Sequence, residues 1–292
     1  MPELPEVEVT RRGLAPLLVG RVVRHVATTR DSTFFLTSPR VLRRRLRGRR
    51  FEGLERLGKY LVAPLDDGQR LLLHLGMTGQ LFGSAPVNPR RPGAAANAPP
   101  LSEAPLSGLQ PDQHTHLRLI FDDRGPDVLF RDVRKFGKVQ LLARGEPCGR
   151  LDKLGVDALA ATVDDLLCRT RRRRAPIKSL LLDQSVIAGV GNIYADEALF
   201  LAGVSPSRRA SRLTREQGRR LVESLKAVLW HALELGGSSI SDYIHPDGDA
   251  GSYQEEHRVY GRQGEPCRVC GTPIRRTKIA QRSSHYCPRC QR

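Results

Sequence analysis

Apolar side chains recur at helical spacing along the first twenty residues of the chain. They occupy positions Leu4, Val7, Leu14, Leu17 and Leu18. Residues three or four positions apart lie on one face of an α-helix, so this pattern predicts a helix near the N-terminus. Gly20 follows the last of them and is a typical helix terminator.

Four short apolar runs follow the predicted helix, at 59–65, 70–75, 116–121 and 127–131. Asp-Asp-Gly at 66–68 separates the first two runs, and the polar segment 122–126 separates the last two. Such pairs are typical of β-hairpins, and we expect 1–147 to form an antiparallel β-sandwich, with a barrel as the alternative packing. Between the hairpins, 84–112 is rich in Pro, Ala and Gly, which indicates a flexible surface insertion.

Helical spacing returns at 148–237, which we expect to form a second, helical domain. Thr214, with Gln three positions later, has the spacing of a capping box, and an apolar stripe follows it. Upstream, 177–183 and 192–201 are predicted as two helices joined through the Ala-Gly-Val-Gly segment 188–191. A strand-rich first part and a helical second part together predict the α+β fold class.

Charge narrows the class of partner. The chain has 48 Lys and Arg against 31 Asp and Glu, which gives a formal net charge of +17 and a pI near 10.4. This excess favours a polyanion such as nucleic acid, although a generally basic protein remains an alternative. The sequence shows no signal peptide and no run of about 18 apolar residues, so we expect a cytoplasmic protein without a membrane partner.

Four of the six cysteines lie in the last twenty-six residues. They form two Cys-x2-Cys pairs, at Cys267, Cys270, Cys287 and Cys290. This spacing is typical of a structural zinc site in which four thiolates leave no open coordination position, and the residues between the pairs can form a hairpin. Basic residues crowd the same module, at Arg275, Arg276, Lys278, Arg282 and Arg289. Beside the overall charge, they favour contact with phosphates over a merely solvated face. The isolated Cys148 and Cys168 are expected to be small buried or half-buried residues.

A second candidate feature is the glycine-rich start of a predicted helix, Gly189 to Asn192. Glycines permit close approach to the backbone, and free N–H groups at a helix start favour an anion. Asn192 could cap the helix or donate to a phosphate. An ordinary turn between helices has the same composition, so this segment alone decides nothing.

The N-terminal residues are a third candidate. If Met1 is removed, as a small second residue usually permits, the nitrogen of Pro2 becomes a secondary amine. An α-amine has a pKa near ~8 against ~10.4 for lysine, so more of it is neutral and nucleophilic at pH 7. Glu3 and Glu6 could serve as acid and base nearby. Proline and acidic residues also simply suit a helix start, and the composition alone favours that interpretation.

Taken in order, the motifs of this chain resemble the formamidopyrimidine-DNA glycosylases, also called 8-oxoguanine DNA glycosylases. The residues that carry the resemblance are MPELPEVE at 1–8, GKYL at 58–61, LHLGMTG at 73–79, DVRKFG at 132–137, the segment 189–197 and the tail from Val259. Only 84–112 stands clearly outside the resemblance. The resemblance implies a bacterial, nucleoid-associated base-excision repair enzyme. Such an enzyme removes oxidised purines from double-stranded DNA and then cleaves the abasic (AP) site by β,δ-elimination.

The resemblance also implies residue roles. Pro2 is the nucleophile that forms a Schiff base, Glu3 protonates the sugar ring oxygen and Glu6 supports the site. Lys59 matches a strand lysine that assists at the phosphate and in the elimination. Three side chains match residues inserted into the duplex where a base is flipped out, namely Met77, Arg134 and Phe136. Five others match residues that hold DNA phosphates, namely His74, Lys178, Asn192, Tyr260 and Arg282.

The same resemblance divides the chain further. It implies a helix–two-turn–helix domain at 148–237, a loop at 238–257 that covers the extruded base, and a zinc-finger module at 258–292 with one structural Zn²⁺. We expect a monomer with no other cofactor. Lys135 stands where many relatives carry a second arginine, which changes little because both are cations.

Two other functions stay open at this point. The endonuclease VIII type shares the proline, the zinc module and the fold but prefers oxidised pyrimidines. Leu4 and the complete set of inserted side chains favour the purine enzyme. A catalytically silent, zinc-dependent damaged-DNA-binding protein is the other alternative, and Pro2, Glu3 and Lys59 argue against it.

Overall fold

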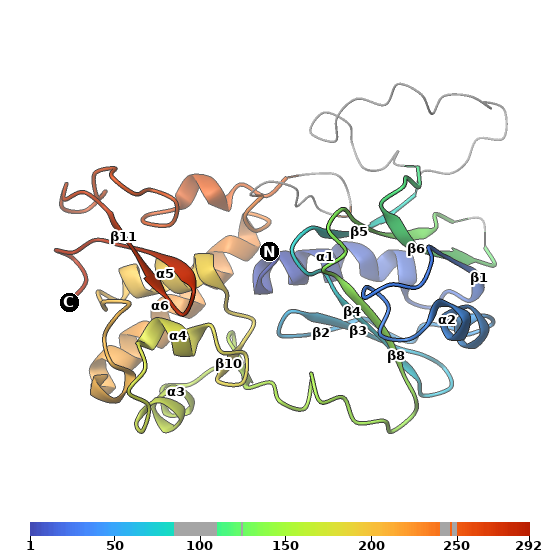
Figure 1. The fold of residues 1–292 in the computed structure, drawn as a ribbon, viewed down its shortest axis with the longest axis horizontal. Helices are drawn as coiled ribbons and strands as arrows, with labels where there is room; N and C mark the ends of the chain where they lie inside the picture. Colours follow the sequence, from blue (N-terminus) through green and yellow to red (C-terminus); the bar gives the residue numbers. More distant parts are fainter. Residues whose placement is uncertain (85–109, 124, 240–245, 247–249) are drawn as a thin grey trace.

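The computed structural model describes residues 1–84, 110–123, 125–239, 246 and 250–292. Two halves lie side by side along the long axis of the molecule, and the N-terminus lies between them (Figure 1). The first half contains two antiparallel sheets, the second is helical, and a C-terminal β-hairpin packs on the helical half. This architecture confirms the predicted α+β class.

Helix α1 (Leu4–Leu18) joins the two halves. Glu3 is its N-cap residue and Glu6 completes a capping box, while Gly20, with φ +82°, follows its end. Leu4 belongs to the hydrophobic core of the helical half, whereas Leu14 belongs to the core of the sandwich. The residues at the start of α1 are therefore fixed at the junction of the two halves.

The sandwich consists of two four-stranded antiparallel sheets. One has the order β1 (Val23–Thr28), β6 (Thr115–Phe121), β7 (Val128–Asp132), β5 (Gly79–Gly83). The other has the order β2 (Glu55–Leu57), β3 (Tyr60–Pro64), β4 (Arg70–His74), β8 (Lys138–Leu142). Both predicted hairpins form, β3 with β4 and β6 with β7. The first predicted strand begins later than expected because Gly58, with φ +59°, and Lys59 form the turn between β2 and β3.

The inward faces of both sheets share one hydrophobic core, to which Phe34, Phe51 and Phe130 contribute. Helix α2 (Pro39–Leu46) covers the end of the sandwich next to β1. Buried Cys148 packs on the outer face of the second sheet with Val62 and Leu142, as expected for a small buried residue, whereas Cys168 is exposed.

The helical half contains four α-helices among the described residues. They are α3 (Val163–Thr170), α4 (Ile177–Leu181), α5 (Asn192–Leu201) and α6 (Arg215–Glu234), accompanied by β9 (Val156–Asp157), β10 (Ile187–Ala188) and the 3₁₀ turn η2 (Ala210–Arg212). The capping box of Thr214 with Gln217 is present. Beyond α6 come the 3₁₀ turn η3 (Tyr253–Glu256) and the hairpin of β11 (Arg275–Ile279) with β12 (Arg282–Tyr286).

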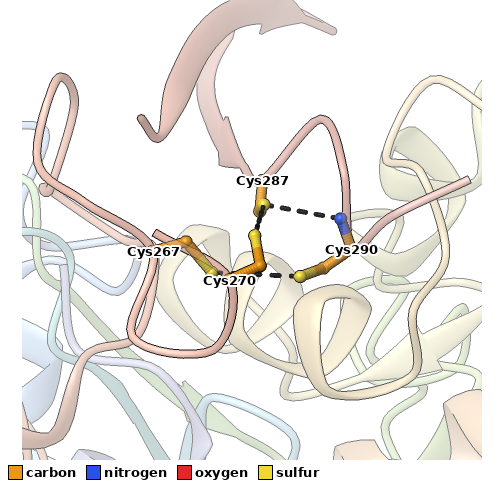
Figure 2. Close-up of side chains that lie close together, drawn as sticks. All are labelled: Cys267, Cys270, Cys287 and Cys290. Carbon is orange, nitrogen blue, oxygen red and sulfur yellow. Dashed lines mark hydrogen bonds between the residues drawn. The ribbon is translucent and has the colours of Figure 1, made fainter. Parts of the chain in front are cut away.

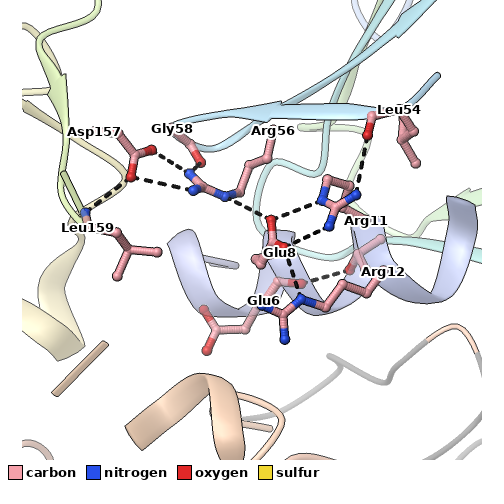
Figure 3. Close-up of polar contacts among 10 residues, drawn as sticks. Glu6, Glu8, Arg11, Arg12, Leu54, Arg56, Gly58, Asp157 and Leu159 are labelled. Carbon is pink, nitrogen blue, oxygen red and sulfur yellow. Dashed lines mark hydrogen bonds and ion pairs between the residues drawn. The ribbon is translucent and has the colours of Figure 1, made fainter. Parts of the chain in front are cut away.

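A charged bridge fastens the two halves beside α1 (Figure 3). Arg56 of β2 donates from Nε to Glu8 of α1 at 3.2 Å and from Nη1 to Asp157 of β9 at 2.6 Å. Arg11 and Arg12 bind the same Glu8 carboxylate. Because Arg56 and Glu8 are largely buried, the bridge restrains the junction more than a surface ion pair would.

Two predicted segments lie partly outside the described residues. The insertion at 84–112 falls mostly on 85–109, which are not described, and the covering loop at 238–257 includes 240–245 and 247–249, which are not described either. Among the described residues, no helix has the length and apolarity to cross a membrane.

Candidate active site and DNA interface

The residues before α1 meet the start of α5 at the junction of the halves. Pro2 is buried, and the backbone N–H of Leu4 donates to the carbonyl of Gly189 at 3.0 Å. The Glu3 carboxylate accepts from the N–H of Ile193 at 3.0 Å and from that of Tyr194 at 3.5 Å. The anion expected at this helix start is therefore the side chain of Glu3 itself.

The glycines of this turn are required by that contact. A Cβ on Gly191 would lie 2.2 Å from Cδ of Glu3, and one on Gly189, whose φ is +101°, would lie 2.6 Å from Leu4. Side chains at these positions would push the start of α1 away from α5. Gly191, rather than Asn192, is the N-cap residue, and Asn192 occupies the first helical position with its Oδ1 buried.

The Glu6 carboxylate links three segments of the chain. One carboxylate oxygen accepts from the backbone N–H of Glu3 at 2.7 Å. The other accepts from the hydroxyl of Tyr194 and from the backbone N–H of Ser238 at 2.8 Å. These bonds fix Glu6 between the start of α1, helix α5 and Ser238.

Burial shifts the titration of the groups around Pro2. Desolvation raises the pKa of Glu3 to about 6, although nearby Lys59 opposes the shift. Desolvation also lowers the pKa of the N-terminal amine, which Met1 carries in this chain, and the pKa of Lys59. The charge of Arg282 lowers both of these pKa values further, so Arg282 faces the same space. Met1 itself is 49% exposed.

His74 ends β4 close to Lys59 and is neutral. Desolvation and the neighbouring cations, Lys59 first among them, lower the pKa of His74 to about 4. Its Nδ1 accepts from the N–H of Gly76 at 3.1 Å. The remaining proton must then lie on Nε2, which is left as a neutral donor.

Met77, Arg134 and Phe136, predicted to enter the DNA duplex, are called the wedge residues below. They occupy two adjoining loops of the sandwich. Met77 is 41% exposed, Phe136 is 53% exposed, and Arg134 is also exposed. A Cβ on Gly76 would come within 2.5 Å of the backbone between Phe136 and Gly137, so the two loops touch there. Two large apolar side chains exposed on adjoining loops indicate a surface that a partner covers.

Asp132 organises the loop 133–137, which carries Arg134 and Phe136 and is called the wedge loop. No role for Asp132 was predicted from the sequence. Its fully buried carboxylate accepts from Thr78 Oγ1 at 2.5 Å and from the N–H groups of Arg134 at 3.2 Å and Gly137 at 2.7 Å. Lys135, at the tip of the loop, has a positive φ of 56°. The available sequence signal was an acid at the end of strand β7 that also begins the motif DVRKFG.

Lys178 does not lie where the prediction of a phosphate contact requires. Its side chain is 0% exposed, and Nζ donates to Asp196 Oδ1 at 2.7 Å and to the carbonyl of Ser283 at 2.6 Å. The structure therefore places Lys178 in a buried ion pair between α4, α5 and the zinc hairpin. A lysine in an otherwise apolar helix start gave no local sign of this burial.

Two adjacent acids of α5 dock the C-terminal module, and the sequence analysis gave neither a role. Asp196 accepts from Ser284 Oγ at 3.1 Å and from the N–H of His285 at 2.8 Å. Glu197 accepts from three consecutive backbone N–H groups at 258–260, at 2.8 to 3.0 Å. These bonds position Tyr260 at one end of the module and the hairpin that carries Arg282 at the other. Their signal in the sequence was a pair of acids inside an apolar helix.

The turn of this hairpin is strained. Ala280 and Gln281 both have positive φ, 48° and 61°, a conformation that usually requires Gly or Asn. The exposed Arg282 follows directly. Because Asp196 and Lys178 anchor the adjacent residues 283–285, the folded module can hold this turn and direct Arg282.

The four predicted zinc ligands converge (Figure 2). The sulfur atoms of Cys267, Cys270, Cys287 and Cys290 all lie within 4.8 Å of one another, with 3.9 Å between Cys267 and Cys290 and 3.5 Å between Cys270 and Cys287. Tetrahedral Zn–S bonds of about 2.3 Å require S···S separations of about 3.8 Å. The donor set and its spacing therefore fit one structural Zn²⁺.

The chain combines a β-sandwich, a helical domain in which the start of α5 binds the Glu3 carboxylate, and a four-cysteine hairpin. This combination defines the class of zinc-finger DNA glycosylases. Residues 1–139 match the Formamidopyrimidine-DNA glycosylase N-terminal domain, 154–244 its H2TH domain, and 264–292 a zinc finger found in FPG and IleRS. The chain belongs to the formamidopyrimidine-DNA glycosylase family.

Individual relatives match over their whole length. The formamidopyrimidine-DNA glycosylase of Solibacter usitatus is 43% identical, with 100% of both chains covered. The crystal structure of the MutM (Fpg) protein of Thermus thermophilus is 40% identical, covers 99% of this chain and 98% of its own, and has a TM-score of 0.82. The Lactococcus lactis Fpg in complex with abasic-site DNA is 33% identical, with 99% of both chains covered and a TM-score of 0.83. Other structures of the Lactococcus protein contain Fapy-dG DNA or oxidised-pyrimidine DNA.

Proposed function

We propose that this protein is a base-excision repair glycosylase and AP lyase that removes oxidised purines from double-stranded DNA with Pro2 as the nucleophile. The observation that carries this proposal is the position of Pro2 and Glu3, which lie at the start of α5. The cations Lys59 and Arg282 lie near the same N-terminal residues. Family membership and the DNA complexes of the Lactococcus lactis relative support the substrate class.

The nucleophile is the nitrogen of Pro2 after removal of the exposed Met1. Desolvation lowers the pKa of the amine that Met1 carries, and a free amine on the buried Pro2 would be favoured in its neutral form for the same physical reason. The nitrogen of Pro2 forms a bond to the sugar C1′ and loses its proton, and the bond from C1′ to the base breaks. The C1′–O4′ bond of the sugar then opens as O4′ takes up a proton, and an iminium between Pro2 and C1′ remains. Because the nitrogen of proline then carries no proton to lose, the iminium stays cationic and favours elimination of the phosphates.

Glu3 is suited to protonate the sugar ring oxygen as the base leaves. Its pKa of about 6 keeps about one tenth of the carboxyl protonated at pH 7, far more than an exposed glutamate. The N–H groups of Ile193 and Tyr194 stabilise the carboxylate that results. Glu6 contributes by fixing the backbone of Glu3.

A ring of donors around this centre holds the DNA backbone. Lys59 and Arg282 supply positive charge, and neutral His74 offers its Nε2–H. Asn192 and Tyr260, positioned by the start of α5 and by Glu197, complete the set. Lys178 does not contact the DNA itself. It holds the hairpin that carries Arg282 and is therefore a positioning residue.

Met77, Phe136 and Arg134 enter the duplex where the damaged base leaves it. An apolar wedge fills the gap in the stack, and the guanidinium addresses the unpaired partner base. Asp132 presets the loop, which lowers the conformational entropy lost on insertion. The four cysteines would hold Zn²⁺, which supplies folding stability to the hairpin rather than a reactive position.

Covalent trapping tests this function. Full-length protein is mixed with a duplex carrying 8-oxoguanine opposite cytosine, borohydride is added, and the adduct is mapped by peptide sequencing. We expect an adduct on Pro2 with Met1 absent, and none for Pro2→Gly. Undiminished trapping in Pro2→Gly would refute the nucleophile. A matched duplex with an oxidised pyrimidine distinguishes the endonuclease VIII-like alternative, and tight binding without any adduct would indicate the catalytically silent alternative.

A further inference from the structure

An eleven-residue segment far from the candidate active site carries a large share of the positive charge. Residues 40–50 contain seven arginines and no acid, so they contribute +7 to the formal net charge of +17. The segment comprises α2 and the turn after it, at the outer end of the sandwich. The N-terminus, by contrast, lies at the centre of the molecule (Figure 1).

Helix α2 separates its apolar and basic residues cleanly. Leu42 and Leu46, one turn apart, are fully buried in the sandwich core. The arginines project outward, and Arg40, Arg43 and Arg44 share one helical face by their spacing. We call the exposed arginines of this segment the arginine face; they are Arg40, Arg43, Arg44, Arg45, Arg47 and Arg50.

Most of this charge is not neutralised within the protein. Arg43 donates to the hydroxyl of Thr28, and the adjoining Arg49 reaches Asp67 at 3.2 Å. Within the described ranges, Arg44, Arg45 and Arg47 have no carboxylate partner. Like charges at helical spacing destabilise a helix, and two cations at its C-terminal end would satisfy the helix dipole. Folding alone therefore does not account for so many arginines here.

The arginine face borders a concave surface. Arg44, Arg45, Arg47 and Arg49, together with Asp67, Gln69 and Ala143, line a cavity of about 450 Å³. Ala143 is the only apolar residue in this lining. Protein–protein interfaces bury apolar and aromatic side chains at their centre, whereas protein–DNA interfaces are polar and strongly basic. The lining therefore fits a nucleic-acid backbone better than an acidic protein.

We propose that the arginine face binds the phosphate backbone of a second DNA segment while the candidate active site holds the first. Guanidinium groups bind phosphate oxygens in pairs, and DNA repeats a negative charge every ~1.7 Å of its axis, so several arginines can be engaged together. Such a contact is independent of base sequence and of damage. It would let the protein pass between neighbouring DNA segments without full release.

The test uses the full-length zinc-loaded protein with its first site occupied. The protein is saturated with an unlabelled duplex that contains a tetrahydrofuran abasic analogue, and a labelled undamaged duplex is then titrated and followed by fluorescence anisotropy. We expect the second duplex to bind wild-type protein with strong salt dependence. Arg44→Gln/Arg45→Gln/Arg47→Gln should weaken that binding about tenfold or more and reduce the salt slope by about 3.

Two control variants separate the site from bulk charge. Arg215→Gln/Arg219→Gln/Arg220→Gln removes three exposed charges from α6 and should retain the second duplex. The conservative Arg44→Lys/Arg45→Lys/Arg47→Lys should retain most of the binding, because a phosphate backbone accepts either cation. Excision of 8-oxoguanine in a single turnover should be unchanged in the glutamine variant of the arginine face, which keeps this test separate from that of the proposed function.

Three outcomes would overturn the proposal. They are no second duplex on saturated wild-type protein, an equal loss in the α6 variant, and equal competition by poly-glutamate. The last outcome would identify a surface for acidic proteins in place of DNA.

Discussion

Lys178 offers the sharpest contrast between a role implied by resemblance and one implied by structure. Lys178→Met removes the ammonium but keeps a long apolar side chain in the same space. Asp196 would then remain as a fully buried carboxylate, bound only to Ser284 and His285 among the partners described above. Breaking a buried ion pair from one side costs about 3–5 kcal/mol of stability.

The double variant Lys178→Met/Asp196→Leu should recover much of that loss, because no unpaired charge remains in the core. Lys153→Met, which removes an exposed lysine, should change the free energy of unfolding by no more than about 0.5 kcal/mol. Urea denaturation of the four proteins measures these differences. The zinc content should be determined in parallel, since the hairpin that Lys178 holds belongs to the zinc module.

DNA binding provides the deciding measurement. A direct phosphate contact contributes about 0.9 to the slope of log affinity against log salt, whereas a positioning residue contributes nothing to the slope as long as the residue that it positions still binds phosphate. We expect Lys178→Met to keep the wild-type slope while its stability falls. A variant of unchanged stability whose slope falls by about one would refute the structural role and restore the phosphate contact.

Three further perturbations test other parts of the site. The pKa of about 6 in folded Glu3 lies above the ordinary 4.5, so this group stabilises the fold below pH 4.5, and the contribution is lost as pH rises through 6. Glu3→Gln should remove this contribution, worth about 2 kcal/mol, in denaturation curves at pH 4.5 and 7.5; identical slopes with pH would contradict the burial argument. Cys287→Ser should release zinc and weaken DNA binding, and normal affinity in metal-free protein would contradict the structural role of the module. Phe136→Ala should slow lesion excision but not cleavage of a preformed abasic site, because the exposed ring acts on the DNA. A large fall in melting temperature would show instead that the ring stabilises the fold.

Local rules determined much of this protein from the sequence. The Cys-x2-Cys pairs predicted the zinc ligands because each pair places two thiolates at one corner of a tetrahedron. The helix at 4–18 and the capping box of Thr214 followed from periodicity and cap residues within a few positions. The two hairpins followed from short apolar runs joined by polar turns. Each of these signals involves residues that are neighbours in the chain.

Contacts between distant residues were decided only by the tertiary structure. The glycine turn at 189–191 suggested an anion site, but only the fold shows that Glu3, some 190 residues earlier, supplies the anion. Asp132 and Asp196 look like ordinary acids in the sequence, yet they hold a wedge loop and a zinc hairpin. Whether Lys178 meets phosphate or a buried carboxylate depends on desolvation, which is set by how α4, α5 and β12 pack together. Charge and spacing along a chain specify chemical capacity, whereas burial and long-range partners decide how that capacity is used.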